Sequence, residues 1–260
     1  MNCRRKAQIT IFAIIAVVLL GAIILFFVFR KEIIPAKTEV NIEENPSSFF
    51  EACLEKDLKS AVNILSLQGG NLNPNLSINF QFEGEDVNNI SFLCYTKSSY
   101  FPCTNQEPIL VKHIEEEITK NITKVTEKCF QQIKEELEAK DYAVEGNFEK
   151  ITIQLSPGKI IGKVIGTILL TKSDQTKKQE DFYFALSSKF YDLVIVAQEI
   201  IAQEARFCNF DSTGFMLLYP DYSIEKFRTS SLNTIYTLKH RTSNEMFRFA
   251  VRSCVIPPGI

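Results

Sequence analysis

The sequence predicts an α+β fold: an N-terminal transmembrane helix, followed by an extracytoplasmic domain of antiparallel sheet with three helices. Three observations predict it. Residues 9–29 form an unbroken apolar run, three later segments have the three-to-four spacing of amphipathic helices, and most other segments alternate apolar and polar residues as strands do. Because helices and strands come in separate groups, antiparallel α+β is favoured over a doubly wound α/β sheet.

The apolar run has the dimensions of a membrane span. Its 21 residues would make a helix of roughly 31 Å, against a hydrocarbon core of about 30 Å. Basic residues precede it without any acid, whereas Glu32 offsets the basic pair that follows. The positive-inside bias therefore predicts a single-pass signal-anchor, with residues 1–30 as cytoplasmic tip and anchor and the C-terminal domain outside the cell membrane.

Two other fates of the N-terminus stay open. A cleaved secretory signal would have a shorter apolar region ending at a small-x-small site, whereas this run ends in Phe-Phe-Val-Phe-Arg-Lys. Processing before the run is the second. Residues 6–10, Lys-Ala-Gln-Ile-Thr, resemble the cleavage site of archaeal type IV pilin precursors, which implies a pilin-like mature chain beginning at Gln8. Phe12 stands where those pilins usually have Glu.

The whole chain also resembles uncharacterised single-pass surface proteins of small-genome archaea. The residues that carry this resemblance are the Lys-Ala-Gln-Ile-Thr-Ile-Phe start, the Glu-Ala-Cys-Leu segment at 51–54 and the Val-Ile-Pro-Pro-Gly segment at 255–259. The resemblance implies a location at the cell surface, and no established activity comes with it.

Residues 31–46 lack a sustained period and are predicted to be a stalk. The domain that follows, 47–260, begins with a helix capped by Ser47 or Ser48 and stopped by Gly69-Gly70. Segments 76–82 and 90–96 then read as a hairpin around a charged tip, residues 83–86. A long helix is predicted over about 106–139, with Pro108 in its first turn.

From residue 142 the pattern changes to strands, so two lobes, 47–140 and 141–260, are one way to divide the domain. A third helix is predicted over 189–207, and residues 173–179 read as a polar loop. The predicted strands are 151–155, 159–171, 182–186, 214–219, 222–228, 233–240 and 245–254.

The net charge and the cysteine count indicate which classes of protein are excluded and which compartment is favoured. Residues 31–260 carry 25 Lys and Arg against 31 Asp and Glu, a net charge of −6, which argues against nucleic-acid binding. Cys3 would lie on the cytoplasmic side and six cysteines outside, an even number that predicts three disulfides in an oxidising compartment. Buried free thiols are the alternative. No cysteine pair has the spacing of a metal site.

The predicted pairs are Cys53–Cys129, Cys94–Cys103 and Cys208–Cys254. Cys53 and Cys129 lie on the apolar stripes of two helices that can pack together. Cys94 and Cys103 flank a Pro-containing loop, and Cys208 and Cys254 end the third helix and the last strand. Three sequons, at Asn75, Asn89 and Asn121, are candidate glycosylation sites of a surface glycoprotein.

No nucleotide loop, nucleophile elbow or zincin motif occurs, so no cofactor, metal or catalytic residue is predicted. The acids around His113 and those of the tip at 83–86 read as solvated faces. The most suggestive cluster is basic: Arg248 and Arg252 share one strand face, and Lys239 and Arg241 come from the preceding strand and its turn. This face is a candidate for an anionic ligand, with an ordinary solvated sheet face as the alternative.

Two functions of different classes follow. The first is a non-enzymatic, membrane-anchored cell-surface protein that contacts the lipid bilayer through its helix and binds a surface protein, a glycan or a neighbouring subunit. The second is an extracytoplasmic hydrolase whose active site has no sequence motif. A serine or cysteine within reach of His113 or His240, or a pocket with two carboxylates, would favour the second.

Overall fold

A computed structural model describes residues 17–21 and 45–255 of the 260-residue chain. The chain divides into two compact units, residues 1–41 and 42–260, and each is described by itself. In the first unit, residues 17–21 are helical; the rest of the predicted span 9–29, Cys3, the site at 6–8 and stalk residues 31–44 lie outside the described residues. Among the described residues, no helix has the length and apolar character needed to cross a membrane.

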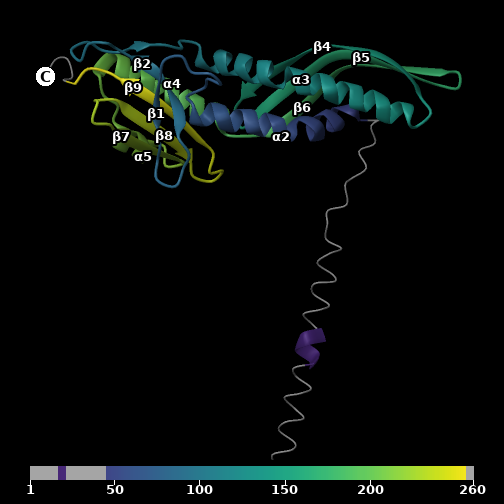
Figure 1. The fold of residues 1–260 in the computed structure, drawn as a ribbon, viewed down its shortest axis with the longest axis horizontal. Coiled ribbons are helices and arrows are strands. Elements are labelled where there is room, and N and C mark those ends of the chain that lie inside the picture. The colour runs from purple at the N-terminus through teal and green to yellow at the C-terminus, as the bar shows by residue number, and fades with distance from the viewer. Residues whose placement is uncertain (1–16, 22–44, 256–260) are drawn as a thin grey trace, which may run out of the picture. The chain divides into compact units, whose positions relative to one another are not determined.

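The second unit contains four helices and nine strands in residues 45–255 (Figure 1). The helices are α2 Pro46–Leu67, α3 Leu110–Glu138, α4 Phe190–Phe207 and α5 Ser212–Leu218. The strands are β1 Ser77–Phe80, β2 Asn88–Tyr95, β3 Thr104–Asn105, β4 Ala143–Ser156, β5 Lys159–Lys172, β6 Gln175–Ser187, β7 Tyr222–Arg228, β8 Thr234–His240 and β9 Met246–Arg252. The predicted α+β class is confirmed.

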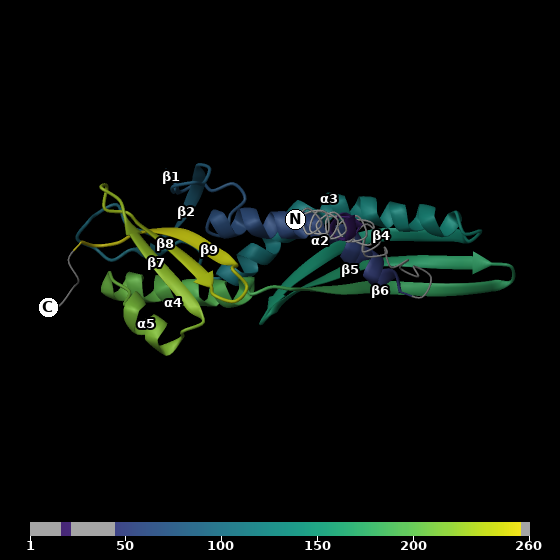
Figure 2. The ribbon, with the colours of Figure 1, turned by 90° about the horizontal axis from the view of Figure 1, so that it is seen from below.

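Strands β4, β5 and β6 form a three-stranded antiparallel sheet, called here the three-stranded sheet. Its inner face is apolar because β-branched, leucine and phenylalanine side chains recur at every second position and are buried. The helices α2 and α3 cover this face side by side (Figure 2). Phe50 of α2 contacts Phe182 of β6, with ring centroids 5.1 Å apart, and Phe130 of α3 contacts Phe148 of β4 at 6.0 Å.

One position on this inner face favours glycine. The ring of Phe184 lies directly over Gly162 on the neighbouring strand, so a Cβ at residue 162 would overlap the ring. An aromatic ring that covers a glycine on the adjacent strand fills the space the missing side chain leaves and helps to fix the register.

The remaining strands form a second sheet, called here the mixed sheet, in the order β1-β2-β9-β8-β7 with β3 paired to β2. The prediction of a purely antiparallel sheet is wrong at one place, since β2 and β9 run parallel. Helix α4 packs on one face of this sheet, where the ring of Phe190 meets that of Phe247 at 5.8 Å. A parallel pair needs a long connection, and here most of the domain lies between the two strands.

Residue 140 does not separate two lobes. Strand β2 comes from the first half of the domain and β9 from its end, yet they are neighbours in one sheet. Helix α2 likewise contacts both β6 and β9. The mixed sheet therefore contains strands from both sides of residue 140. The three-stranded sheet, which follows residue 140, is covered by helices that precede it.

Five predicted elements differ in detail. Helix α3 begins at Leu110, so Pro108 precedes the helix and does not lie in its first turn, and β4 begins at Ala143, earlier than the predicted 151. Residues 212–218 are helix α5 rather than a strand, because the Asp211 side chain accepts a hydrogen bond from Gly214 N and caps the first turn. Strand β6 already begins at Gln175, since a two-residue turn joins it to β5 and leaves no long polar loop. Helix α2 is capped by Asn45, whose Oδ1 accepts from Ser48 N, with Pro46 in the first turn.

Candidate functional site

The predicted basic face is only partly assembled. Strands β8 and β9 pair as expected, with Thr237 opposite Arg248 and Lys239 opposite Met246. Arg248 is nevertheless buried, with 3% of its side chain exposed. The loop after β1 turns back over this side of the sheet and brings Glu85 and Phe82 against Arg248. The charged tip at 83–86, which was expected to be solvated, therefore covers the face.

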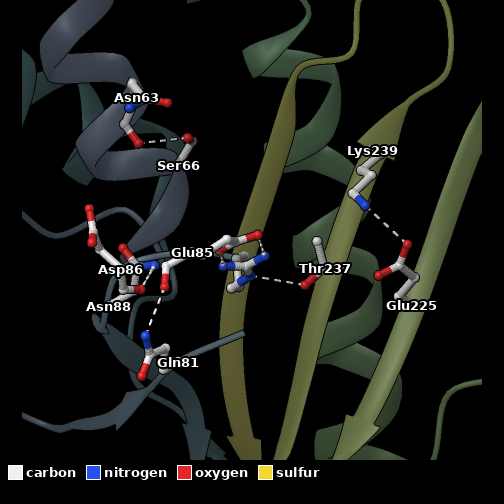
Figure 3. A network of polar contacts seen from close by, with 10 residues as sticks. Asn63, Ser66, Gln81, Glu85, Asp86, Asn88, Glu225, Thr237 and Lys239 are labelled. Carbon is white, nitrogen blue, oxygen red and sulfur yellow. Dashed lines mark hydrogen bonds and ion pairs between the residues drawn. The ribbon is translucent and has the colours of Figure 1, made fainter. Parts of the chain in front are cut away.

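The guanidinium of Arg248 is occupied by internal partners, among them Glu85 and Thr237, which Figure 3 labels. Its Nη1 and Nη2 donate to the two carboxylate oxygens of Glu85 at 2.7 and 3.1 Å, and its Nε donates to Thr237 Oγ1 at 3.0 Å. The guanidinium carbon lies 4.1 Å from the centroid of the Phe82 ring. This bidentate hydrogen bond from Arg248 holds the pKa of Glu85 below its ordinary value of 4.5. Arg248 therefore holds the loop to the sheet and is not available to a ligand.

The other predicted basic residues do not surround a shared site. Lys239 Nζ lies 3.1 Å from Glu225 Oε1 across the β7–β8 pair (Figure 3). The backbone N–H of Arg241 donates to Asp221 O at the end of that hairpin. Arg252, at the opposite end of β9, lies over the ring of Tyr95. The prediction of one anionic-ligand face is wrong, because residues 78–85 cover the face of β8 and β9 on which Arg248 lies. The spacing of residues in the sequence could not place this segment there.

The three predicted disulfides are confirmed. Cys53–Cys129 links α2 to α3, Cys94–Cys103 closes the loop between β2 and β3, and Cys208–Cys254 ties the end of α4 to the end of β9. Their Cα atoms are 6.1, 5.3 and 5.4 Å apart, within the range that a disulfide requires. These six cysteines are therefore not available as nucleophiles or metal ligands.

The two histidines both hold turns and helix ends in place. His113 Nε2 lies 2.9 Å from Asn71 Oδ1. His240 is buried, and its Nδ1 faces the turn that follows β8, with Ser243 Oγ at 3.3 Å and Thr242 Oγ1 at 3.2 Å.

Ser243 and His240 do not form a nucleophile–base pair with an acid behind the base. The carboxylate of Glu245 accepts from Ser243 Oγ and from Lys189 N at the start of α4, so it faces the serine and not the imidazole. A triad needs the acid on the far nitrogen of the histidine. Within residues 17–21 and 45–255, no group of three His, Cys, Asp or Glu side chains is placed to hold a metal.

The candidate glycosylation sites differ in exposure. Asn75, in the loop before β1, and Asn121, in the middle of α3, are exposed. Asn89 is half-buried within β2, opposite Asn79 of β1.

One pocket of about 320 Å³ lies where α2, the end of β6 and the β8–β9 turn meet. Its lining includes the apolar side chains of Leu58, Ile160 and Met246, together with serine hydroxyls and Glu245. The backbone N–H of Lys189 at the start of α4 donates a hydrogen bond to the Glu245 carboxylate. This carboxylate already offsets the partial positive charge of the helix N-terminus, which could otherwise attract an anion.

A wider groove, of about 530 Å³, lies between α4 and α5. Helix α5 has four apolar residues in seven, Phe-Met-Leu-Leu at 215–218, yet none of its residues is buried. Leu217 and Leu218 are 80% and 77% exposed. We call this surface, with Ile195 of α4 and Tyr219, the α4–α5 surface. Alternation in 214–219 predicts a strand, so the sequence pattern does not indicate this exposed helix.

Compared with known proteins, the chain matches no family model, no curated protein and no solved structure. The interpretation of its function therefore depends on its own residues.

Proposed function

We propose that this protein is a membrane-anchored cell-surface protein whose domain binds a partner protein through the α4–α5 surface. The observation that carries the proposal is the exposure of α5. Phe215 packs against Phe210 and Tyr222 and so holds α5 to the domain, whereas Leu217 and Leu218 gain little from burial in the isolated chain. Contact with a partner accounts for these two exposed leucines.

The shape of this surface suits a protein segment. The groove has an apolar lining from Ile195, Phe215 and Tyr222, and its length follows α4 from Asp192 to Gln203. Apolar side chains at helical spacing can enter such a groove and bury Leu218 from the other side. Large, well-placed aromatic and aliphatic residues usually provide most of the binding energy at such contacts.

The rim of the groove indicates the charge of the partner. Asp192 and Glu199 line it, and no Lys or Arg does, although Lys189 Nζ lies 3.5 Å from Asp192 Oδ2 and offsets part of that charge. We therefore expect a partner segment with apolar residues flanked by Lys or Arg, since opposite charges favour encounter and like charges disfavour wrong partners.

Membrane anchoring is supported by the sequence. The run at 9–29 has the length of a span, and basic residues outnumber acids before it. Three disulfides in the domain are consistent with an oxidising compartment outside the cytoplasm. Protease added to intact cells should then degrade the domain; full protection would contradict the proposed orientation.

Site-specific photocrosslinking of the full chain on cells tests the binding surface. With p-benzoylphenylalanine at residue 218, we expect an adduct whose peptide has apolar residues flanked by Lys or Arg. The adduct should be lost when Ile195→Glu is added and weakened by Asp192→Lys. The matched control places the same crosslinker at Tyr183, which is 54% exposed on the three-stranded sheet.

The outcomes separate the alternatives. An adduct with a second copy of the chain would support the proposal and identify the partner as a neighbouring subunit. Equal yields at residues 218 and 183, a lipid adduct or no adduct at residue 218 would each contradict it.

A further inference from the structure

Four chain segments meet at the end of the mixed sheet where β2 and β9 finish (Figure 1). Thr96 N donates to Arg252 O at 2.9 Å, and Val255 N donates to Ser99 O at 3.0 Å. The disulfide Cys208–Cys254 joins the end of α4 to the end of β9, and the β7–β8 turn lies beside them because Thr234 pairs with Val251. We call this surface, residues 97–101, 206–207, 228–232 and 252–255, the sheet tip.

The sheet tip exposes five apolar side chains from these four segments. Their exposed fractions are Tyr100 84%, Phe101 67%, Phe207 50%, Leu232 47% and Val255 46%. Single exposed apolar residues are ordinary on a protein surface, but a group gathered from separate loops at one end of a sheet indicates a contact site.

The charge of the sheet tip is of one sign. Lys97, Arg206, Arg228 and Arg252 belong to it, and the segments 95–103, 205–209, 227–233 and 251–255 contain no Asp or Glu. Glu204, which lines the hollow at this end, is buried and bonded internally to Tyr236 Oη and Lys226. A chain with net charge −2 thus presents a purely basic end.

The chain fixes these residues in place. The disulfide Cys94–Cys103 closes the loop that carries Tyr100 and Phe101, and Phe101 N donates to Ser98 O within it. Leu232 has a φ of +64°, in the left-handed region that bulky residues rarely adopt. Its side chain is half exposed, so burial does not compensate the strain, and such positions are frequent at functional sites.

We propose that the sheet tip is a membrane-contact surface that inserts its aromatic residues into a bilayer with anionic headgroups. Tyr and Phe are favoured at the membrane interface, and Lys and Arg beside them attract anionic lipid. The tip consists of loop ends, and the hollow among them is only about 20 Å³, which leaves no groove for a peptide. This inference is independent of the α4–α5 surface, whose acidic rim would repel the same lipids.

The chain contains no tryptophan, so a single introduced one reports its own surroundings. Full-length Phe101→Trp is mixed with phosphatidylcholine vesicles, with or without phosphatidylglycerol, that contain brominated lipid as a quencher. We expect a blue shift and quenching only with phosphatidylglycerol. Tyr183→Trp, on the three-stranded sheet, is the control and should stay unquenched.

Charge reversal in the Phe101→Trp background tests the electrostatic part. Each basic residue near an anionic membrane contributes about fivefold to partitioning, so Lys97→Glu with Arg228→Glu should weaken it by at least about 25-fold. Lys150→Glu with Lys159→Glu, exposed on β4 and β5, makes the same charge change elsewhere and should leave the quenching unchanged.

Flotation of the protein with the vesicles is recorded separately and reports the N-terminal anchor. Flotation without quenching at residue 101 would overturn the tip proposal and leave the anchor standing, and an acidic protein surface would become the better partner. Equal quenching with and without phosphatidylglycerol, or in the Tyr183→Trp control, would overturn it as well. Quenching at residue 101 with anionic lipid supports it whether or not the anchor is present.

Discussion

The two sheets of this domain are built by different means, although both have helices packed against a buried face. The three-stranded sheet is a run of consecutive hairpins, and α2 and α3 cover one face while the other faces solvent. The mixed sheet joins β2 to β9 from opposite ends of the domain, and both of its faces are covered: one by α4, the other by residues 78–85. A sheet whose strands are neighbours in the sequence can be predicted from the alternation of apolar and polar residues. A sheet that pairs strands far apart in the sequence cannot, because its pairing depends on contacts between remote segments.

The largest expected effect compares the cross-links that hold the two regions. In the loop-entropy view, Cys53→Ser with Cys129→Ser, which opens a closure of 76 residues between helices that cover the three-stranded sheet, should lower the free energy of unfolding by up to about 4.5 kcal/mol. Cys94→Ser with Cys103→Ser, with a separation of nine, should cost up to about 2.7 kcal/mol. Urea unfolding followed by circular dichroism measures both; equal losses would show that loop length does not set the difference.

The buried ion pair tests whether the mixed sheet depends on its cover. Glu85→Gln leaves the guanidinium of Arg248 buried without its charge partner, so we expect a loss of about 2–3 kcal/mol, below the 3–5 kcal/mol or so of a fully buried pair because water reaches Glu85. The matched control, Glu225→Gln, breaks the exposed pair with Lys239 and should cost at most about 1 kcal/mol. If both substitutions cost the same in denaturant unfolding, the loop is not held by this pair.

The same pair predicts a pH dependence. Because the folded state lowers the pKa of Glu85 below 4.5, its contribution to stability is present above pH 4.5 and is lost as the pH falls through the lower, folded-state pKa. Unfolding measured as a function of pH should show this acid loss in the parent chain and a smaller one in Glu85→Gln. An unchanged acid profile would contradict the role assigned to the pair.

The smallest expected effect tests the fit of the three-stranded sheet. Gly162→Ala places a methyl group under the Phe184 ring and should destabilise the domain by about 2 kcal/mol, as overpacking usually does. Adding Phe184→Leu removes the ring, so the double variant should lose less than the sum of the two single variants. If the losses measured by thermal unfolding are additive, the Phe184 ring and Gly162 do not interact energetically.

Sequence patterns located most of the elements and all three cysteine pairs. The stripes of α2 and α3 predicted both the helices and the Cys53–Cys129 bond, because two apolar stripes bury each other only by packing together. Alternation predicted β4 to β6, although it placed the starts of both β4 and β6 too late. The exposed polar residues at 175–180 resemble a loop.

The mixed sheet has contacts that sequence patterns could not predict. Spacing correctly placed Arg248 and Arg252 on one strand face, but only the folded chain shows that Glu85 and Phe82, 163 and 166 positions away from Arg248, cover it. Helix α5 was likewise decided by the Asp211 cap and not by alternation. The sequence by itself therefore determined most of the local elements and the cross-links, and it predicts an anchor at 9–29. Tertiary structure decided which polar groups are buried and which apolar groups are exposed, because those depend on segments far apart in the chain.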